Sequence, residues 1–304
     1  MMPVSLQADW FAEAEQAGNY QALARGFYRQ AGLDVTILDG GPGGFPLQKV
    51  AEGQADMALG RSDDVILAVA RSHLPLVILC AYMEKDPMAV LVHAASPVRG
   101  FRDMAGKTVM ADPASAWVPY LKARYHMEFG LVADNYGLSE FMVEPNLIVQ
   151  GFATNEPYYL RLHGVPTRTL LIADSGYNPY RVIYSNQGFV RDHPDAARAF
   201  VAATLRGWND FLTGDPTPGE SMIYARNRSI TPAFMAFSIR AMAEDHLLRG
   251  NPARGERLGL ITRRRLQEQV DLFWKLKVIE TRIPVDAFAT FAFLPPDLAA
   301  LAQN

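Results

Sequence analysis

The chain has 304 residues, a formal net charge of −3 and 49% hydrophobic residues, which suits a soluble globular protein of about two domains. The mildly acidic balance argues against a nucleic-acid binder, which would show a strongly basic face. Cys80 is the single cysteine, so the chain cannot hold an internal disulfide framework or a multi-cysteine zinc site. The apolar run from Val65 to Cys80 is interrupted by Arg71, His73 and Pro75 and is too short to span a membrane.

The first part of the chain alternates short β-rich runs with helical patterns. This alternation is typical of α/β units around a largely parallel sheet. The predicted strands of this part are Val4–Ala8, Leu33–Leu38, Ala55–Leu59, Leu76–Met83 and Met88–His93. The predicted helices are Asn19–Gln30, Pro46–Glu52 and Asp63–Ser72, the last capped by Ser62.

The same alternation restarts after residue 100, which suggests a second, similar lobe. Its predicted strands are Thr108–Ala111, Phe141–Val143, Asn146–Gln150, Thr169–Ala173 and Val182–Ser185. Its predicted helices are one from Pro113 to Phe129 and one at Asn155–His163. From about Pro194 the pattern is mainly helical, with predicted helices at Asp195–Leu212, Pro232–Leu248, Thr262–Leu276 and Val285–Ala289 and a loop at Gly214–Gly219.

These patterns predict a discontinuous two-lobed protein. The first lobe would hold residues 1–87 and 187–304, including the extra C-terminal helices, and the second lobe residues 88–186. Crossings near residues 82–88 and 181–186 would form the hinge. Small-molecule sites often lie between domains, so we expect a ligand in the cleft between the lobes.

Motifs for catalysis and for metal binding are absent from the sequence. The glycine-rich loop Gly40–Gly44 has neither the G-x-G-x-x-G spacing nor the Lys-Ser/Thr ending of a phosphate-binding loop. The chain contains no G-x-S-x-G and no H-E-x-x-H, and its six histidines are isolated. The Arg263–Arg265 run is expected to form a solvated helix face. We therefore expect no metal and no cofactor.

Aromatic and polar side chains follow several predicted strands or begin the helices after them. Open α/β sheets bind ligands at the carboxyl ends of their strands, where aromatic rings can stack on a flat ligand and a carboxylate can accept N–H hydrogen bonds. Ordinary packing would explain any one of these residues, but the set is the expected ligand site. The candidates are Trp10, Tyr20, Ser62, Asp63, Tyr82, Ser115, Trp117, Asn155, Glu156, Tyr158 and Tyr177.

Several ordered motifs resemble a family of periplasmic solute-binding proteins. The opening Asp9-Trp10 followed by Gly18-x-Tyr20 is similar to the D-W-x-P-N-x-x-H-x-G-x-Y opening of binding proteins for thiamine pyrimidine precursors, which are akin to nitrate, sulfonate and taurine binders. Further matching segments are 53–58, 103–109, 150–158 and 293–295.

The resemblance implies a type II, venus-flytrap fold and delivery of ligand to an ABC permease at the membrane. It also implies a periplasmic monomer whose signal peptide would be absent from this sequence. Trp10 would stack on the ligand, Glu156 would contact its amino-nitrogen edge, and Tyr158 would form an aromatic wall. The sequence departs from the opening motif at Ala12, Glu13 and Gln16.

Two alternatives stay open beside a binder of thiamine pyrimidine precursors. In the first, the ligand is a sulfonate, nitrate or aromatic carboxylate held by amides at the helix start near Ser115. In the second, the protein is a pyrimidine-forming enzyme, as is a fungal synthase of this fold. Gln16 in place of the motif histidine, together with the single cysteine, favours a binder over that enzyme.

Overall fold

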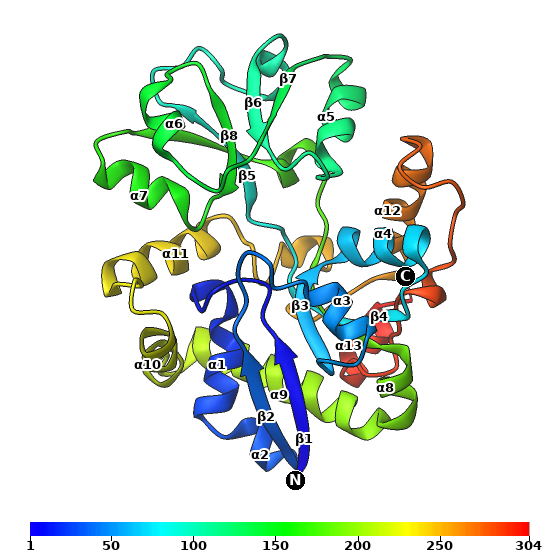
Figure 1. Ribbon diagram of the computed structural model, residues 1–304. Coiled ribbons are helices and arrows are strands. Elements are labelled where there is room, and N and C mark those ends of the chain that lie inside the picture. The colour runs from blue at the N-terminus through cyan, green and yellow to red at the C-terminus, as the bar shows by residue number, and fades with distance from the viewer. Residues whose placement is uncertain (304) are drawn as a thin grey trace. The chain divides into compact units, whose positions relative to one another are not determined.

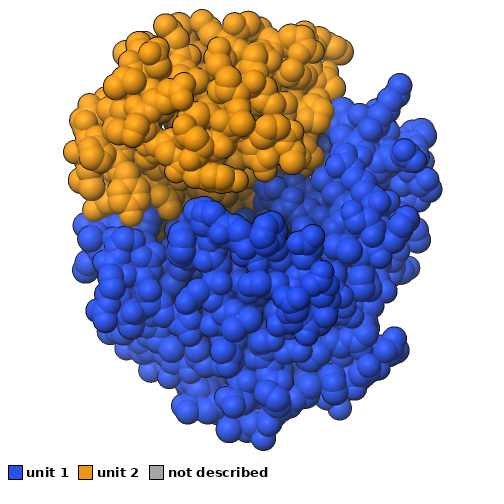
Figure 2. All heavy atoms as spheres, in the orientation of Figure 1, with its two compact units in different colours: residues 1–84, 179–235, 248–304 blue, residues 85–178, 236–247 orange. Residues whose placement is uncertain are grey.

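The computed structural model describes residues 1–303, which divide into two compact units (Figures 1 and 2). Unit 1 comprises Met1–Glu84, Pro179–Met235 and the chain from Leu248 onward, and unit 2 comprises Lys85–Asn178 and Ala236–Leu247. The division differs from the predicted one at residues 179–186, which belong to unit 1, and at 85–87 and 236–247, which belong to unit 2. Within residues 1–303, no helix is long and apolar enough to cross a bilayer.

Unit 1 is built on a five-stranded sheet. Its strands, in spatial order, are β2 (Leu33–Leu38), β1 (Met2–Gln7), β3 (Met57–Arg61), β10 (Arg181–Asn186) and β4 (Leu76–Met83). The pairs β1–β2 and β1–β3 are parallel, whereas β10 runs antiparallel to both β3 and β4. The expectation of a largely parallel sheet is therefore only partly right, because the chain inserts a late return strand between two early ones.

Burial explains the composition of these strands. In β2 the buried residues Leu33, Val35 and Ile37 alternate with the exposed Asp34 and Thr36, as expected for a strand with one solvated face. All eight residues of β4 are buried. The outer edge of β4 is covered by the C-terminal part of the chain, since the backbones at residues 78 and 288–290 exchange hydrogen bonds of 2.8 and 3.0 Å.

Helices surround this sheet in unit 1 (Figure 1). They are α1 (Ala17–Ala24), α2 (Phe27–Gln30), α3 (Pro46–Ala51), α4 (Ser62–Ser72), α8 (Gln187–Asp192), α9 (Pro194–Thr213), α10 (Thr217–Arg226), α12 (Arg263–Lys275) and α13 (Pro296–Leu301), with short 3-10 turns at Ala14–Gln16, Pro252–Arg254 and Val285–Ala287. The helix α11 (Pro232–Glu244) begins in unit 1 and continues into unit 2. Helices α1 and α9 pack closely because Gly18 has no side chain: a Cβ at this position would lie 2.1 Å from the Trp208 ring.

Unit 2 has its own five-stranded mixed sheet. The spatial order is β7 (Gly130–Ala133), β6 (Thr108–Ala111), β8 (Ile148–Phe152), β5 (Met88–His93) and β9 (Thr167–Leu171), with β5 antiparallel to β8 and β9. Its helices are α5 (Trp117–Tyr125), α6 (Ser139–Val143) and α7 (Glu156–Leu162), with 3-10 turns at Phe101–Met104 and Ile172–Ser175. The core of this unit includes Leu91, Met110, Phe141 and Val149. The predicted α/β class is confirmed by these two mixed sheets with their helices.

Several predicted elements differ from the structure, and one strand was not predicted. The segment Phe141–Val143, predicted as a strand, belongs to the helix α6. Phe141 is buried and Val143 is exposed, so the apolar run does not mark a buried strand. The single helix expected at Asn19–Gln30 is divided at Gly26, whose φ of +70° lies in the left-handed region. The loop expected at Gly214–Gly219 contains the start of α10, where Pro218 occupies the first turn. The edge strand β7 was missed because its four residues are exposed and carry no alternating pattern.

Candidate functional site

In unit 1, an aromatic pair follows β1 at its carboxyl end. Trp10 is half-buried and lies edge-on to the 49% exposed Phe11, with their ring centroids 5.5 Å apart. The loop after β2 passes directly behind this bend, since a Cβ on Gly40 would lie 2.4 Å from the carbonyl oxygen of Ala8. The glycine therefore allows two loops to meet closely at this sheet edge, next to the half-buried Trp10.

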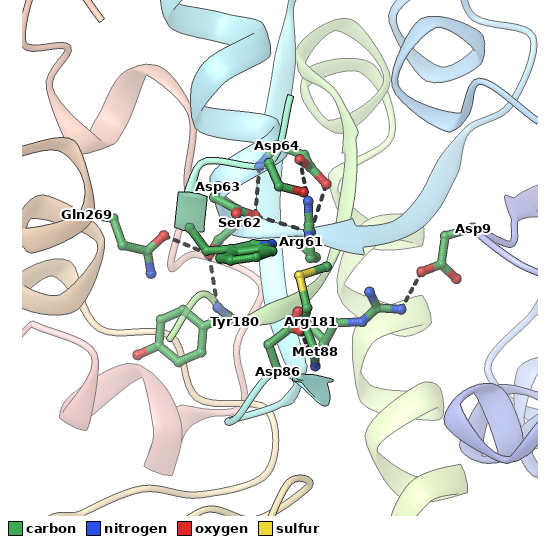
Figure 3. Close-up of polar contacts among 12 residues, drawn as sticks. Asp9, Arg61, Ser62, Asp63, Asp64, Asp86, Met88, Tyr180, Arg181 and Gln269 are labelled. Carbon is green, nitrogen blue, oxygen red and sulfur yellow. Dashed lines mark hydrogen bonds and ion pairs between the residues drawn. The ribbon is translucent and has the colours of Figure 1, made fainter. Parts of the chain in front are cut away.

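The same bend contains a cluster of charged and polar groups around Asp9. Arg181, at the start of β10, donates to Asp9 Oδ2 through Nη2, which also lies 3.6 Å from Glu15 Oε2 (Figure 3 shows the Asp9 pair). Arg181 Nε donates to the Tyr82 hydroxyl at 3.0 Å, and Gln16 Nε2 donates to Asp9 Oδ1 at 3.2 Å. The guanidinium is thus shared between two carboxylates and a phenol.

Negative charge exceeds positive charge along this stretch of chain. The segment from Asp9 to Gln16 carries three acidic side chains, including the buried Glu13, and no basic one. Arg181 faces two of these carboxylates. Glu13 and Glu15 are buried, so Asp9, whose side chain is 15% exposed, is the carboxylate of this stretch that keeps partial access to solvent. A carboxylate in this position favours a partner that donates hydrogen bonds over an anion.

Two of the predicted tyrosines lie inside unit 1 rather than at its surface. Tyr82 is fully buried and stacks on Trp208, with ring centroids 6.4 Å apart and planes inclined by 8°; burial raises the pKa of its hydroxyl well above the usual range. Tyr20 is also fully buried, and burial raises its pKa to about 12. Tyr82 supports the bend after β1 from the interior through its hydrogen bond with Arg181, whereas the Tyr20 ring centroid lies 5.6 Å from the guanidinium carbon of Arg226.

Ser62 and Asp63, at the start of α4, are occupied by contacts within unit 1. The Ser62 hydroxyl donates to Gln269 Oε1 at 2.7 Å and accepts from the Tyr180 amide at 2.9 Å (Figure 3). Asp63 Oδ1 lies 3.4 Å from Arg61 Nε and accepts from the amide of the next residue at 3.0 Å. These side chains organise the strand ends rather than extend from them.

In unit 2, Gln150 of β8 connects two predicted site residues. Its Oε1 accepts from Trp117 Nε1 at 3.0 Å and from the Ser115 hydroxyl at 3.3 Å. Trp117 is fully buried, so its indole packs in the interior. The backbone amide of Ser115 donates to the Asp112 carbonyl at 3.0 Å. This amide is therefore already hydrogen-bonded within the protein, although a sulfonate, nitrate or carboxylate ligand was expected to bind the amides at this helix start.

Glu156 occupies the first turn of α7, directly after β8. Its Oε2 accepts from the Phe152 amide at 2.5 Å, and a Cβ on Gly151 would lie 2.9 Å from the same oxygen. The carboxylate thus accepts a hydrogen bond from the end of β8 and belongs to the N-terminal turn of α7, the positive end of the helix dipole. Glu156 and its neighbour Asn155 are half-buried, which leaves part of this helix start accessible.

The two remaining tyrosines belong to aromatic groups of unit 2. Tyr158 is 9% exposed, and its ring centroid lies 5.6 Å from that of Phe237 on α11. Tyr177 is 4% exposed, and its ring centroid lies 5.4 Å from that of Tyr120, whose hydroxyl donates to the Ser175 carbonyl at 2.8 Å. Both tyrosines are mostly enclosed by other side chains.

The predicted set therefore divides by exposure. The half-buried members are Trp10, Asn155 and Glu156, and the others lie in the interior. Asp9 could have been found from its place beside Trp10, whereas Arg181 is 172 residues away from Asp9 and has no local sequence signal. Among residues 1–303, no cluster of His, Cys, Asp and Glu side chains is suited to a metal ion.

A family model matches most of the chain. The family described as NMT1/THI5 like matches residues 13–217. The riboflavin-binding protein RibY of Chloroflexus aurantiacus is 25% identical over 70% of this chain and 63% of its own length. The formylaminopyrimidine-binding protein of Halalkalibacterium halodurans is 26% identical over 67% of this chain and 65% of its own length. The match thus spans slightly less than two thirds of these curated relatives.

A solved structure shows the fold. The alkanesulfonate-binding protein SsuA from Xanthomonas axonopodis pv. citri, bound to MOPS, superposes with a TM-score of 0.69 at 12% identity, over 95% of this chain and 98% of that one. The chain therefore has the periplasmic-binding-protein fold, as its motifs predicted. At this identity, the likeness establishes the architecture alone.

Proposed function

We propose that this chain, which belongs to the NMT1/THI5-like family, is the solute-binding component of an ABC importer and works in the periplasm. Its ligand would be a small, flat nitrogen heteroaromatic related to thiamine pyrimidine precursors, delivered to a membrane permease. The names of the two curated relatives, for riboflavin and for formylaminopyrimidine, refer to compounds of this chemical class and support the proposal. Both relatives are named as binding proteins, which supports a role without catalysis.

The observation that carries the ligand class is the acidic, aromatic bend after β1. Trp10 is half-buried and directly follows Asp9, whose carboxylate keeps partial exposure, while Glu13 and Glu15 on the same stretch of chain are buried. Amino groups and protonated ring nitrogens donate hydrogen bonds to carboxylates, while a flat ring stacks on indole. An aminopyrimidine provides both features in one molecule.

A second acidic group in unit 2 supports the same class. Glu156 is half-buried at the start of α7, and its carboxylate occupies the helix N-terminus that an anionic ligand would otherwise use. In unit 1, the N-terminal turn of α4 likewise contains Asp63 and Asp64. These two helix starts therefore give no support to the sulfonate, nitrate or carboxylate alternative, which uses the amides near Ser115.

Isothermal titration calorimetry tests this function with 4-amino-2-methylpyrimidine and benzenesulfonate as probes. We expect the wild type to bind the aminopyrimidine, and we expect Trp10→Ala and Glu156→Gln each to weaken it about tenfold, because each removes one stacking or charged contact. The matched control is Asp34→Asn, an exposed acid on β2.

The outcomes separate the ligand classes. Binding of benzenesulfonate that is equal or stronger in Glu156→Gln would support the anion alternative. Absence of heat with every aminopyrimidine tried would reject the proposed ligand class. Chemical turnover of the aminopyrimidine would reject a purely binding role.

A further inference from the structure

The chain passes between the two units at four points, after residues 84, 178, 235 and 247. On the unit 1 side, the residues next to the first two points contact one helix, α12. The contacts come from Arg265 and Gln269, which are four residues apart and therefore lie on the same face of α12. Neither residue was among the predicted site residues, and the arginine run was expected to be solvated.

Arg265 contacts the chain next to both of these crossings, on the unit 1 side. Its Nη2 donates to the carbonyl oxygen of Glu84 at 2.6 Å, and its Nη1 donates to Glu84 Oε2 at 3.2 Å. The guanidinium carbon also lies 3.7 Å from the centroid of the Tyr180 ring. One planar, always charged group thus fixes the last residue of unit 1 before the first crossing and the second residue after the next crossing.

Gln269 completes the contact with the second crossing through Ser62. The Gln269 Oε1 accepts from the Ser62 hydroxyl, which in turn accepts from the Tyr180 amide (Figure 3). The Ser62 amide donates to the Tyr180 carbonyl at 2.9 Å. Both backbone groups of Tyr180 are therefore bonded to one residue, which α12 orients.

The fourth crossing also meets this cluster. A Cβ on Gly250, which lies just after that crossing, would be 3.0 Å from Glu84 Cβ and 2.4 Å from Glu256 Oε2. Glu84 is 2% exposed, so its carboxyl group is held in the interior beside Arg265. A buried polar contact such as that between Glu84 and Arg265 contributes little net stability, so a role in fixing geometry is the better reason for this arrangement.

We propose that Arg265 and Gln269 are positioning residues that brace the chain crossings on unit 1 and thereby set ligand affinity without touching the ligand. The inference rests on the proposed function. Loss of the brace would lower the fraction of molecules in the binding-competent conformation. Apparent affinity would fall in proportion to that fraction.

The test compares Arg265→Ala, Arg265→Lys and Gln269→Leu with the control Arg263→Ala, which removes an exposed pair with Asp286 on the same helix. Affinity for 4-amino-2-methylpyrimidine is measured by calorimetry and stopped flow. Hydrogen exchange of the ligand-free proteins is measured at residues 82–85 and 178–181. We expect Arg265→Ala to weaken binding about tenfold, mainly through a slower association rate, and to speed exchange at both segments.

Arg265→Lys should restore part of the affinity, because an ammonium group can meet one partner but not the whole set. A lower melting temperature with unchanged affinity in the Arg265 and Gln269 variants would overturn the inference and leave a merely structural role. If Arg265→Ala did not fold, Arg265→Lys and Gln269→Leu would decide it by the same criterion. Unchanged hydrogen exchange at both segments in Arg265→Ala would overturn the inference, whether or not the wild type binds a probe. Failure of the wild type to bind any probe would separately reject the proposed function.

Discussion

Replacement of Arg181 by methionine tests the charge cluster after β1. Methionine keeps most of the aliphatic volume but removes the donor to Asp9 and Tyr82 and the cation 3.6 Å from Glu15. The side chains of Arg181, Asp9 and Glu15 are 7%, 15% and 6% exposed, so solvent screens these charges weakly. Removal of one partner from a buried ion pair costs about 3 to 5 kcal/mol. We expect a loss of this size in the free energy of unfolding.

Urea-induced unfolding followed by tryptophan fluorescence measures this loss. Arg191→Met is the matched control, because Arg191 is 74% exposed and its pair with Asp192 should contribute less than about 1 kcal/mol. In the double variant Asp9→Asn/Arg181→Met, much of the loss should be recovered, since one of the carboxylates left without this guanidinium is gone. A cost below about 1 kcal/mol for Arg181→Met, or no coupling with Asp9, would refute the reasoning.

Two further predictions concern stability. Burial, assisted by Glu256 and opposed by Arg265, raises the pKa of Glu84 from 4.5 to about 8. The folded protein therefore binds this proton more tightly than the unfolded protein does. The stability that this group contributes is greatest below pH 4.5 and is lost as the pH rises to about 8. Within that window, the unfolding equilibrium constant should increase by at most about tenfold per pH unit. Glu84→Gln should remove that slope in urea titrations at several pH values, and an unchanged slope would count against it. Gly18→Ala places a methyl group 2.1 Å from Trp208 and should lower the unfolding free energy by about 1 to 3 kcal/mol in the same assay; a neutral result would show that α1 and α9 can separate without cost.

Local elements could be predicted where the sequence pattern is strong. The alternation in Leu33–Leu38 and the apolar run Leu76–Met83 indicated strands that the structure contains with the same bounds. Predictions failed where a single residue changes direction or where burial is weak, as at Gly26 and in β7. In the first case the backbone conformation of one glycine outweighs a helical pattern, and in the second no apolar face marks the strand.

The site divides along similar lines. The Asp9-Trp10 pair and Glu156 could be selected from local motifs, and these residues keep partial exposure. Tyr82 and Trp117 have equally plausible sequence positions, yet both are fully buried. Which side of a strand or helix faces the interior depends on the element that packs against it, and one sequence window does not contain that element.

The sequence by itself determined the α/β class, the family motifs and the acidic, aromatic bend after the first strand. Tertiary structure alone decided the insertion of β10 between β3 and β4, which brings Arg181 to Asp9 across 172 residues. It also placed Arg265, from a run expected to be solvated, against the buried Glu84. The physical reason is the same in both cases: the partner lies far away in the chain and has no local sequence signal, and a polar group that folding removes from water needs a hydrogen-bond partner that only the packed elements supply.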